Sequence, residues 1–273
     1  MPQSYKSFAI VGAGGYIGTF ILNAFVAGGY KPLIVSRKLS SYSPPASLSA
    51  PFVKVDLENV NEVSAVLREH RIEVLISLVG TDGISSQRVL ADAAKKSGVK
   101  LFVPSEFGFV SEGISKIAVE DQRTPQAEKD RLIGLVGAFF QWMNWLTGYD
   151  ENGKINILGK GETPVGLTHE EDIGGFVAYT LTTLTPAQLH SRSFRIEGDT
   201  VTLAEIAKRL DKEVVFVDRL PGGPHNEAKN QIGWLAEAGK GSSRWDYAIS
   251  GLQDALDNDL WQGHVWKKFT SMM

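Results

Sequence analysis

The chain of 273 residues contains no cysteine. This absence excludes disulfide bonds, thiolate nucleophiles and zinc–thiolate sites, and it fits a reducing compartment. Basic residues are not in excess either: the net charge is −3 and no basic stripe occurs, so the electrostatic footprint of nucleic-acid binding is missing. No apolar run is long enough to span a bilayer, and the residues before the first predicted strand lead us to expect no signal peptide. We therefore expect a soluble, cytoplasmic protein that binds neither nucleic acid nor membrane.

Several catalytic signatures are missing too. The Tyr-x-x-x-Lys pair typical of short-chain dehydrogenases occurs nowhere, and no Gly-x-Ser-x-Gly supports a hydrolase. The five histidines show no metal-ligand spacing, so no metal site is predicted. His169 lies in the run THEE, which is better explained as a capping box at the start of a helix.

The most informative segment that is present is residues 7–18, SFAIVGAGGYIG. An apolar run, Phe8–Val11, leads into glycines spaced by three, and Tyr16–Ala27 is apolar at helical spacing. A strand, a glycine turn and a helix place helix-start amides against a phosphate. Glycine triplets also occur in ordinary loops, but this position favours dinucleotide binding. The predicted contacts from this loop are Gly12, Gly15, Tyr16, Ile17 and Gly18.

The first half of the chain alternates between strand and helix patterns. Strands are predicted over 31–36, 51–55, 73–79 and 99–103, and helices over 60–70, with Asn59 as a possible N-cap, and over 84–97, with Gly98 at the stop. This alternation predicts an α/β fold with a parallel sheet covered on both faces. Ligands of such sheets lie beyond the carboxyl ends of the strands, which here include Val79 and Gly80.

The end of the second predicted strand carries Ser36, Arg37 and Lys38. Dinucleotide sites that bind NAD usually place a carboxylate here, whereas a guanidinium can grip a 2′-phosphate with two hydrogen bonds. The alternative is that these bases only solubilise a loop, but two bases with no acid beside them favour NADP(H). Asp56, after the third strand, is predicted either to contact the adenine amino group or to cap the helix that follows.

Residues 103–108 have the sequence VPSEFG and are preceded by AAKKSGVK. This run resembles the signature of the isoflavone reductase and pinoresinol–lariciresinol reductase group, within the NmrA-like family of atypical short-chain dehydrogenases. The glycine loop, the helix that contains Gln87, residues 153–181 and residues 194–210 are similar to further parts of that family. The resemblance extends from about Phe8 to about Arg219.

This resemblance implies a Rossmann-type doubly wound sheet, a smaller C-terminal substrate lobe and a pocket for the nicotinamide. Ser105, Glu106 and Phe107 would lie beside the ring, and Gly137 and Phe139 look like the family's later G-x-F cofactor element. From the residues alone, SEFG is a turn after a buried strand, with Ser and Gly as turn formers.

The resemblance also makes Lys129 the catalytic candidate. Thr124 and Pro125 look like the N-cap and first residue of a helix, which puts Lys129 in its second turn. Reductases of the family have a helix lysine that helps to protonate or polarise the substrate, and desolvation lowers a lysine pKa toward the range that acid–base chemistry needs. The alternative is that residues 128–131 form a solvated helix face.

One segment departs from the family. Relatives place a longer helix and another parallel strand between the lysine and the G-x-F element, but this chain has only DRLIGLV between Lys129 and Gly137. A full helix and a strand need more room than this. We therefore expect that a strand is missing here or is built from other residues, which puts the geometry of Lys129 and Phe139 in question.

Two domains are predicted, an NAD(P)-binding domain over 1–149 and an interleaved substrate lobe over 150–273. In the second half, helices are expected around 226–238 and 245–256. Five side chains are candidates for an apolar pocket, of which only one or two are expected to touch a ligand: Trp142, Met143, Trp145, Trp234 and Trp261.

Two functions are compatible with these residues. The first is an NADPH-dependent reductase of an aromatic or phenylpropanoid-like small molecule, with Lys129 assisting proton transfer. The second is an NmrA-like NADP(H)-binding protein that senses redox state and regulates a protein partner without turnover. Fold alone does not separate them.

Overall fold

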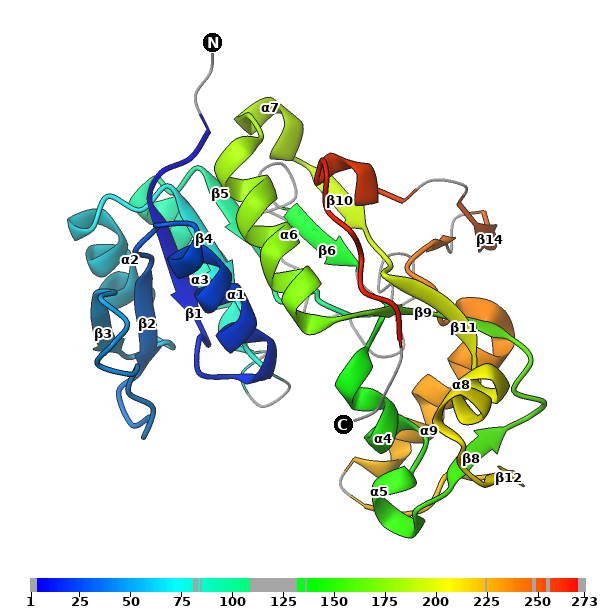
Figure 1. Cartoon of the computed structure of the whole chain (residues 1–273). Helices are drawn as coiled ribbons and strands as arrows, with labels where there is room; N and C mark the ends of the chain where they lie inside the picture. The colour runs from blue at the N-terminus through cyan, green and yellow to red at the C-terminus, as the bar shows by residue number, and fades with distance from the viewer. Residues whose placement is uncertain are drawn as a thin grey trace. The chain divides into compact units, whose positions relative to one another are not determined.

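A computed structural model describes residues 4–80, 83, 85–108, 132–135, 137–223, 225–246, 249–253 and 256–269 (Figure 1). Thr124, Pro125 and the candidate Lys129 lie outside these residues. The described chain forms two compact units. The first contains the chain up to Glu106 and returns with Ile173–Phe194, whereas the second contains Phe107, Gly108 and residues 137–172 and continues from Arg195. The domain boundary predicted at residue 149 stays a prediction.

The first unit is built on a five-stranded parallel sheet in the order β3-β2-β1-β4-β5. The strands are β1 (Phe8–Val11), β2 (Leu33–Arg37), β3 (Phe52–Val55), β4 (Val74–Ser77) and β5 (Leu101–Val103). The order reverses direction at β1, because the chain first adds strands on one side and then on the other. Such a switch point, at the carboxyl ends of β1 and β4, is where open α/β sheets bind ligands.

Helices cover both faces of this sheet, as the alternation of the sequence predicts: α1 (Tyr16–Ala27) on one face, and α2 (Val60–Glu69) and α3 (Ser86–Ser97) on the other. The unit also contains residues of α6 (Glu170–Thr183) and the short helix α7 (Pro186–Leu189). Ala9, Val11 and Leu75 share a core cluster with α2 and α3, whereas the Phe8 ring lies 4.8 Å from the ring of Phe25 in α1.

The helix α6 packs on α1 at very close range. A Cβ atom on Gly174 of α6 would lie 2.6 Å from the carbonyl oxygen of Phe20 in α1, so only glycine fits there. At the start of α6, the ring Nδ1 of His169 accepts the N–H of Glu171 (3.1 Å), which gives this histidine a structural role.

The second unit combines several small sheets with short helices. Its strands are β7 (Ala138–Phe139), β8 (Ile155–Leu158), β9 (Pro164–Thr168), β11 (Asp199–Thr202), β12 (Val214–Val217), β13 (Trp245–Asp246) and β14 (Gly251–Leu252). Its helices are η3 (Phe140–Trp142), α4 (Met143–Leu146), α5 (Tyr149–Asn152), α8 (Leu203–Leu210), α9 (Asn226–Leu235), η4 (Ala236–Lys240) and η5 (Asn258–Leu260). The pairings are β11-β9-β7, β12-β8 and β13-β14.

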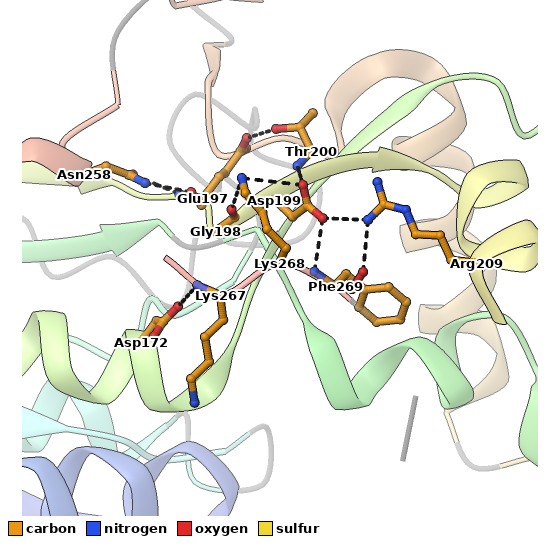
Figure 2. A network of polar contacts seen from close by, with 10 residues as sticks. All are labelled: Asp172, Glu197, Gly198, Asp199, Thr200, Arg209, Asn258, Lys267, Lys268 and Phe269. Atoms are coloured by element: carbon orange, nitrogen blue, oxygen red, sulfur yellow. Dashed lines mark hydrogen bonds and ion pairs between the residues drawn. The ribbon is translucent and has the colours of Figure 1, made fainter. Parts of the chain in front are cut away.

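A network of polar contacts ties the C-terminal segment into this unit (Figure 2). The carboxylate of Asp199 accepts the backbone N–H of Phe269 (3.1 Å) and a guanidinium N–H of Arg209 (2.8 Å). Asp172 accepts the backbone N–H of Lys267 (2.8 Å), and Lys268 donates to the carbonyl of Gly198 (2.7 Å). Because the Phe269 side chain is fully buried, the segment is part of the core rather than a loose tail.

Two expectations about the chain need correction. The helix predicted over 245–256 is wrong, because β13 and β14 form an antiparallel pair there. The segment after Lys129 does contain a strand, β6 (Leu132–Leu135), but among the described residues it pairs with β10 (Arg192–Arg195) and not with β5. The extra parallel strand of the family is therefore not part of the described central sheet.

Candidate functional site

The glycine loop lies between β1 and α1, at the switch point of the sheet. Gly12 has a φ of +88°, and a Cβ atom there would lie 2.5 Å from the carbonyl oxygen of Leu78. A Cβ atom on Gly18 would lie 2.2 Å from the carbonyl oxygen of Gly12. The fold itself therefore requires both glycines, the first for the turn and the second for close packing of helix on strand.

Gly15 has a different explanation. It is the N-cap of α1 with extended φ and ψ of −78° and 173°, a conformation open to any residue, and no side chain caps the helix there. Its nearest neighbour, the Gly12 carbonyl oxygen, would lie 3.2 Å from an added Cβ atom. Since the protein's own packing constrains Gly15 less than Gly12 and Gly18, the fold does not by itself explain this glycine, and its contact with an anionic ligand at the start of α1 stays a prediction.

The end of β2 carries two basic side chains, of which one forms an ion pair and the other does not. The Lys38 ammonium forms an ion pair with Glu62 at 2.8 Å, and this hydrogen bond raises the pKa of Lys38. The exposed guanidinium of Arg37 has no hydrogen-bond or ion-pair partner in the described part of the chain. Arg37 is therefore the cation available to a ligand, and Glu62 is a neighbour that the sequence did not reveal, because it comes from α2.

Asp56 follows β3 and shapes the turn into α2. Its Oδ1 accepts the N–H of Glu58 (3.0 Å), while the cap of α2 is Asn59, whose Oδ1 accepts the N–H groups of Asn61 and Glu62 (3.0 and 3.2 Å). The N-cap predicted at Asn59 is confirmed. The capping role considered for Asp56 is wrong, and its contact with an adenine stays a prediction.

The ends of β4 and β5 are joined by hydrogen bonds around Ser105. Its hydroxyl donates to the carbonyl oxygen of Val79 (2.8 Å), and its N–H donates to Oε1 of the buried Gln87 (2.6 Å). Gln87 thus fixes the Ser105 turn against α3. The family resemblance pointed to Gln87, but no pattern in the sequence predicted this contact.

Three other predicted residues belong to the second unit. Gly137 has a φ of +69°, and a Cβ atom on it would lie 2.4 Å from the carbonyl oxygen of Gly166, so this glycine is required by the pairing of β7 with β9. The Phe139 ring is buried and lies 4.6 Å from the Trp142 ring. Their contacts with a cofactor, like that of Phe107, stay predictions.

The aromatic candidates divide between core and surface. Met143 is fully buried, whereas Trp142 and Trp234 are 42% and 46% exposed. The ring of Trp261 stacks on His264 at 3.6 Å. Trp234 lies in an open groove of about 640 Å³, whose other lining residues are Asp218, Arg219, Glu227, Asn230, Gln231 and Leu235.

The described residues contain no group of three or more His, Asp or Glu side chains arranged to hold a metal ion. Among the same residues, no helix is both long enough and apolar enough to cross a membrane.

Comparisons with known proteins bear on the family and on the fold of this chain. Residues 4–120 match the model of the NmrA-like family. The isoflavone reductase homolog of Solanum tuberosum is 27% identical over 231 residues, 74% of this chain and 73% of that protein. The phenylcoumaran benzylic ether reductase PT1 of Pinus taeda is 29% identical over 238 residues, 77% and 76% of the two chains. The solved complex of leucoanthocyanidin reductase with NADPH from Vitis vinifera has a TM-score of 0.76 at 20% identity, over 96% of both chains.

These matches confirm two predictions. The resemblance first indicated by VPSEFG, to the NmrA-like and isoflavone reductase-like proteins, is confirmed by the family model and by the relatives. The Rossmann-type α/β fold is confirmed by the parallel sheet and by the solved structure, which extends over nearly the whole chain.

Proposed function

We propose that this chain, a relative of the NmrA-like and isoflavone reductase-like proteins, is an NADPH-dependent reductase of a small aromatic, phenylpropanoid-like molecule. One observation carries the proposal. The glycine loop, where no side chain caps α1, and the exposed guanidinium of Arg37, which has no partner among the described residues, lie at the carboxyl ends of the neighbouring strands β1 and β2. Relatives named for the reduction of such substrates, and one solved with NADPH, support it.

The residues of the first unit fit NADP(H). Gly15 leaves the helix-start amides of α1 open to a pyrophosphate, and Arg37 offers a cation to a 2′-phosphate, where a carboxylate would repel it. Ser105, held by Gln87 and by the Val79 carbonyl, would form part of a rigid wall beside the nicotinamide. When bound, NADPH supplies the hydride.

The substrate needs a proton as well as a hydride, and Lys129 is the proposed donor. Its role rests on the family resemblance, because it lies outside the described residues. A lysine beside an apolar ring and a cationic cofactor loses hydration, which lowers its pKa and allows proton transfer near neutral pH.

The direct test incubates the purified protein with NADPH and a panel of aromatic enones, quinones and lignan-type ethers, while cofactor absorbance is followed. Oxidation of NADPH that depends on one acceptor class supports the reductase and names its substrate class. If no acceptor is reduced although NADPH binds, the proposal of catalysis is wrong.

A second function is favoured by the short connection after Lys129. Only seven residues, 130–136, separate Lys129 from Gly137, and the strand they contain pairs with β10. If this arrangement keeps the Lys129 amine too far from the bound cofactor to donate a proton, the chain would bind NADP(H) and regulate a protein partner without turnover. Tight NADPH binding with no turnover on the whole panel would favour this function.

A further inference from the structure

One aromatic side chain outside the predicted site touches the glycine loop. Tyr42 lies in the Ser-rich segment after β2, and its ring covers Gly14. A Cβ atom added to Gly14 would lie 2.3, 2.6 and 2.7 Å from three ring carbons of Tyr42, which is closer than real contacts allow. The contact therefore requires glycine at position 14.

The contact is not explained by the backbone of Gly14, which lacks the positive φ seen at Gly12. Nor does the ring cover the whole loop. Among the described residues outside α1 and apart from its chain neighbours, the atoms within 4 Å of a Cβ atom placed on Gly15 are the carbonyl oxygens of Gly12 and Leu78, at 3.2 and 3.9 Å. The Tyr42 ring thus flanks the loop at Gly14 and is not among these neighbours of Gly15.

Several contacts hold Tyr42 and the end of β2 together. The N–H of Tyr42 donates to the Ser40 hydroxyl (3.2 Å), the N–H of Ser40 donates to the Arg37 carbonyl (3.0 Å), and Lys54 of β3 donates to the Ser40 carbonyl (2.7 Å). The Tyr42 ring also packs edge-on against Phe52 at 6.2 Å. Arg37 itself lies in β2 opposite Val55 of β3, and these contacts link the residues that follow it to β3 and, through the Tyr42 ring, to the glycine loop.

Charge at this position is compatible with a phosphate. Partial burial raises the pKa of the Tyr42 phenol, so it is neutral near pH 7 and does not repel an anion. Of the two bases nearby, Lys38 is neutralised by Glu62, and Arg37 remains available.

We infer that Tyr42 is a positioning residue for the cofactor: its ring, seated on Gly14, holds Arg37 at a fixed place relative to the glycine loop. Arg37 can then contact the 2′-phosphate while the glycine loop contacts the pyrophosphate of the same NADPH. Residues 37–42 need not become ordered first. The inference rests on the proposed binding of NADP(H). It adds a determinant of the preference for NADPH over NADH that touches neither phosphate directly.

The test measures the dissociation constants of NADPH, NADH and 2′,5′-ADP by calorimetry for the wild type and for Tyr42→Phe, Tyr42→Ala, Gly14→Ala and the double variant. Tyr42→Ala should weaken NADPH and 2′,5′-ADP about tenfold, as expected if the competent arrangement falls to about a tenth of the population. NADH should change much less. Tyr42→Phe keeps the ring and should bind like the wild type, and melting temperatures check that all variants fold.

The double variant separates the ring contact from a direct role of Gly14. Gly14→Ala alone should act like Tyr42→Ala, because the methyl group displaces the ring, and Gly14→Ala combined with Tyr42→Ala should be no weaker than either. Additive losses, or unchanged NADPH preference in Tyr42→Ala, would overturn the inference. Tighter NADPH binding in Tyr42→Ala would overturn it as well, since the ring would then obstruct the site. A wild type that binds none of the three ligands refutes the proposed function itself.

Discussion

The three glycines of the loop, Gly12, Gly15 and Gly18, are needed for different physical reasons, and substitutions distinguish a role in folding from a role in binding. Gly12 and Gly18 touch backbone atoms of the protein, whereas Gly15 is in an extended conformation beside open helix-start amides. Gly15→Val should therefore leave the protein folded but abolish NADPH binding, because a branched side chain would stand where the pyrophosphate approaches. Calorimetry measures binding, and circular dichroism checks the fold. Gly18→Val is the contrast, since a side chain there meets the Gly12 carbonyl at 2.2 Å and should destabilise the fold. Normal NADPH binding by Gly15→Val would mean that the loop is misassigned.

At the scale of elements, periodicity predicted helices that bury one face, such as α1, whose bounds agree with the prediction. It failed at 245–256, where the hairpin of β13 and β14 depends on distant contacts. The buried Arg195 guanidinium donates to the carbonyls of Ser243 and Trp245 (2.6 and 2.8 Å), and no local pattern encodes that partner. The pairing of β6 with β10 is likewise set by residues about 60 positions apart in the sequence.

The C-terminal segment gives a prediction at this same scale. Asp199→Ala would remove the acceptor of the buried Phe269 N–H, which would be left unsatisfied, and the ion-pair partner of Arg209, which keeps its hydrogen bond to the Phe269 carbonyl. We expect a loss of about 1–3 kcal/mol in the free energy of unfolding, measured by urea denaturation. Glu213→Ala is the matched control, because Glu213 pairs with Lys154 on the surface and should cost well under about 1 kcal/mol. Equal losses in the two variants would show that the Asp199 network does not hold the segment.

At the scale of the whole molecule, the parallel sheet could be predicted from the alternation of strands and helices, whereas its strand order could not, because the same alternation is compatible with more than one order. The return of the chain to the first unit at α6 could not be predicted either, because it depends on the close approach of Gly174 to Phe20. For the candidate site, the glycine loop, Arg37 and Ser105 were predicted from the sequence and from the family resemblance. The contacts of Tyr42 with Gly14 and of Glu62 with Lys38 were not, since each residue comes from a segment that carries no motif of its own.

The proposed catalysis is tested by a substitution of Lys129. If the protein is a reductase, Lys129→Ala should lower turnover by about a hundredfold or more, the scale of a lost general acid or base. Its NADPH affinity should change much less, because the glycine loop and Arg37 remain. Lys154→Ala, at an exposed ion pair, is the control and should keep full turnover. Retained turnover in Lys129→Ala would mean that another group protonates the substrate.

Arg37 and the glycine loop are proposed to give this chain its affinity for NADPH, and calorimetry with NADPH and NADH measures that affinity. We expect the wild type to bind NADPH more tightly than NADH. Arg37→Ala should remove most of that preference, about 1.5–3 kcal/mol for a hydrogen bond to a charged group. Equal affinity of the unmodified protein for the two cofactors would contradict it.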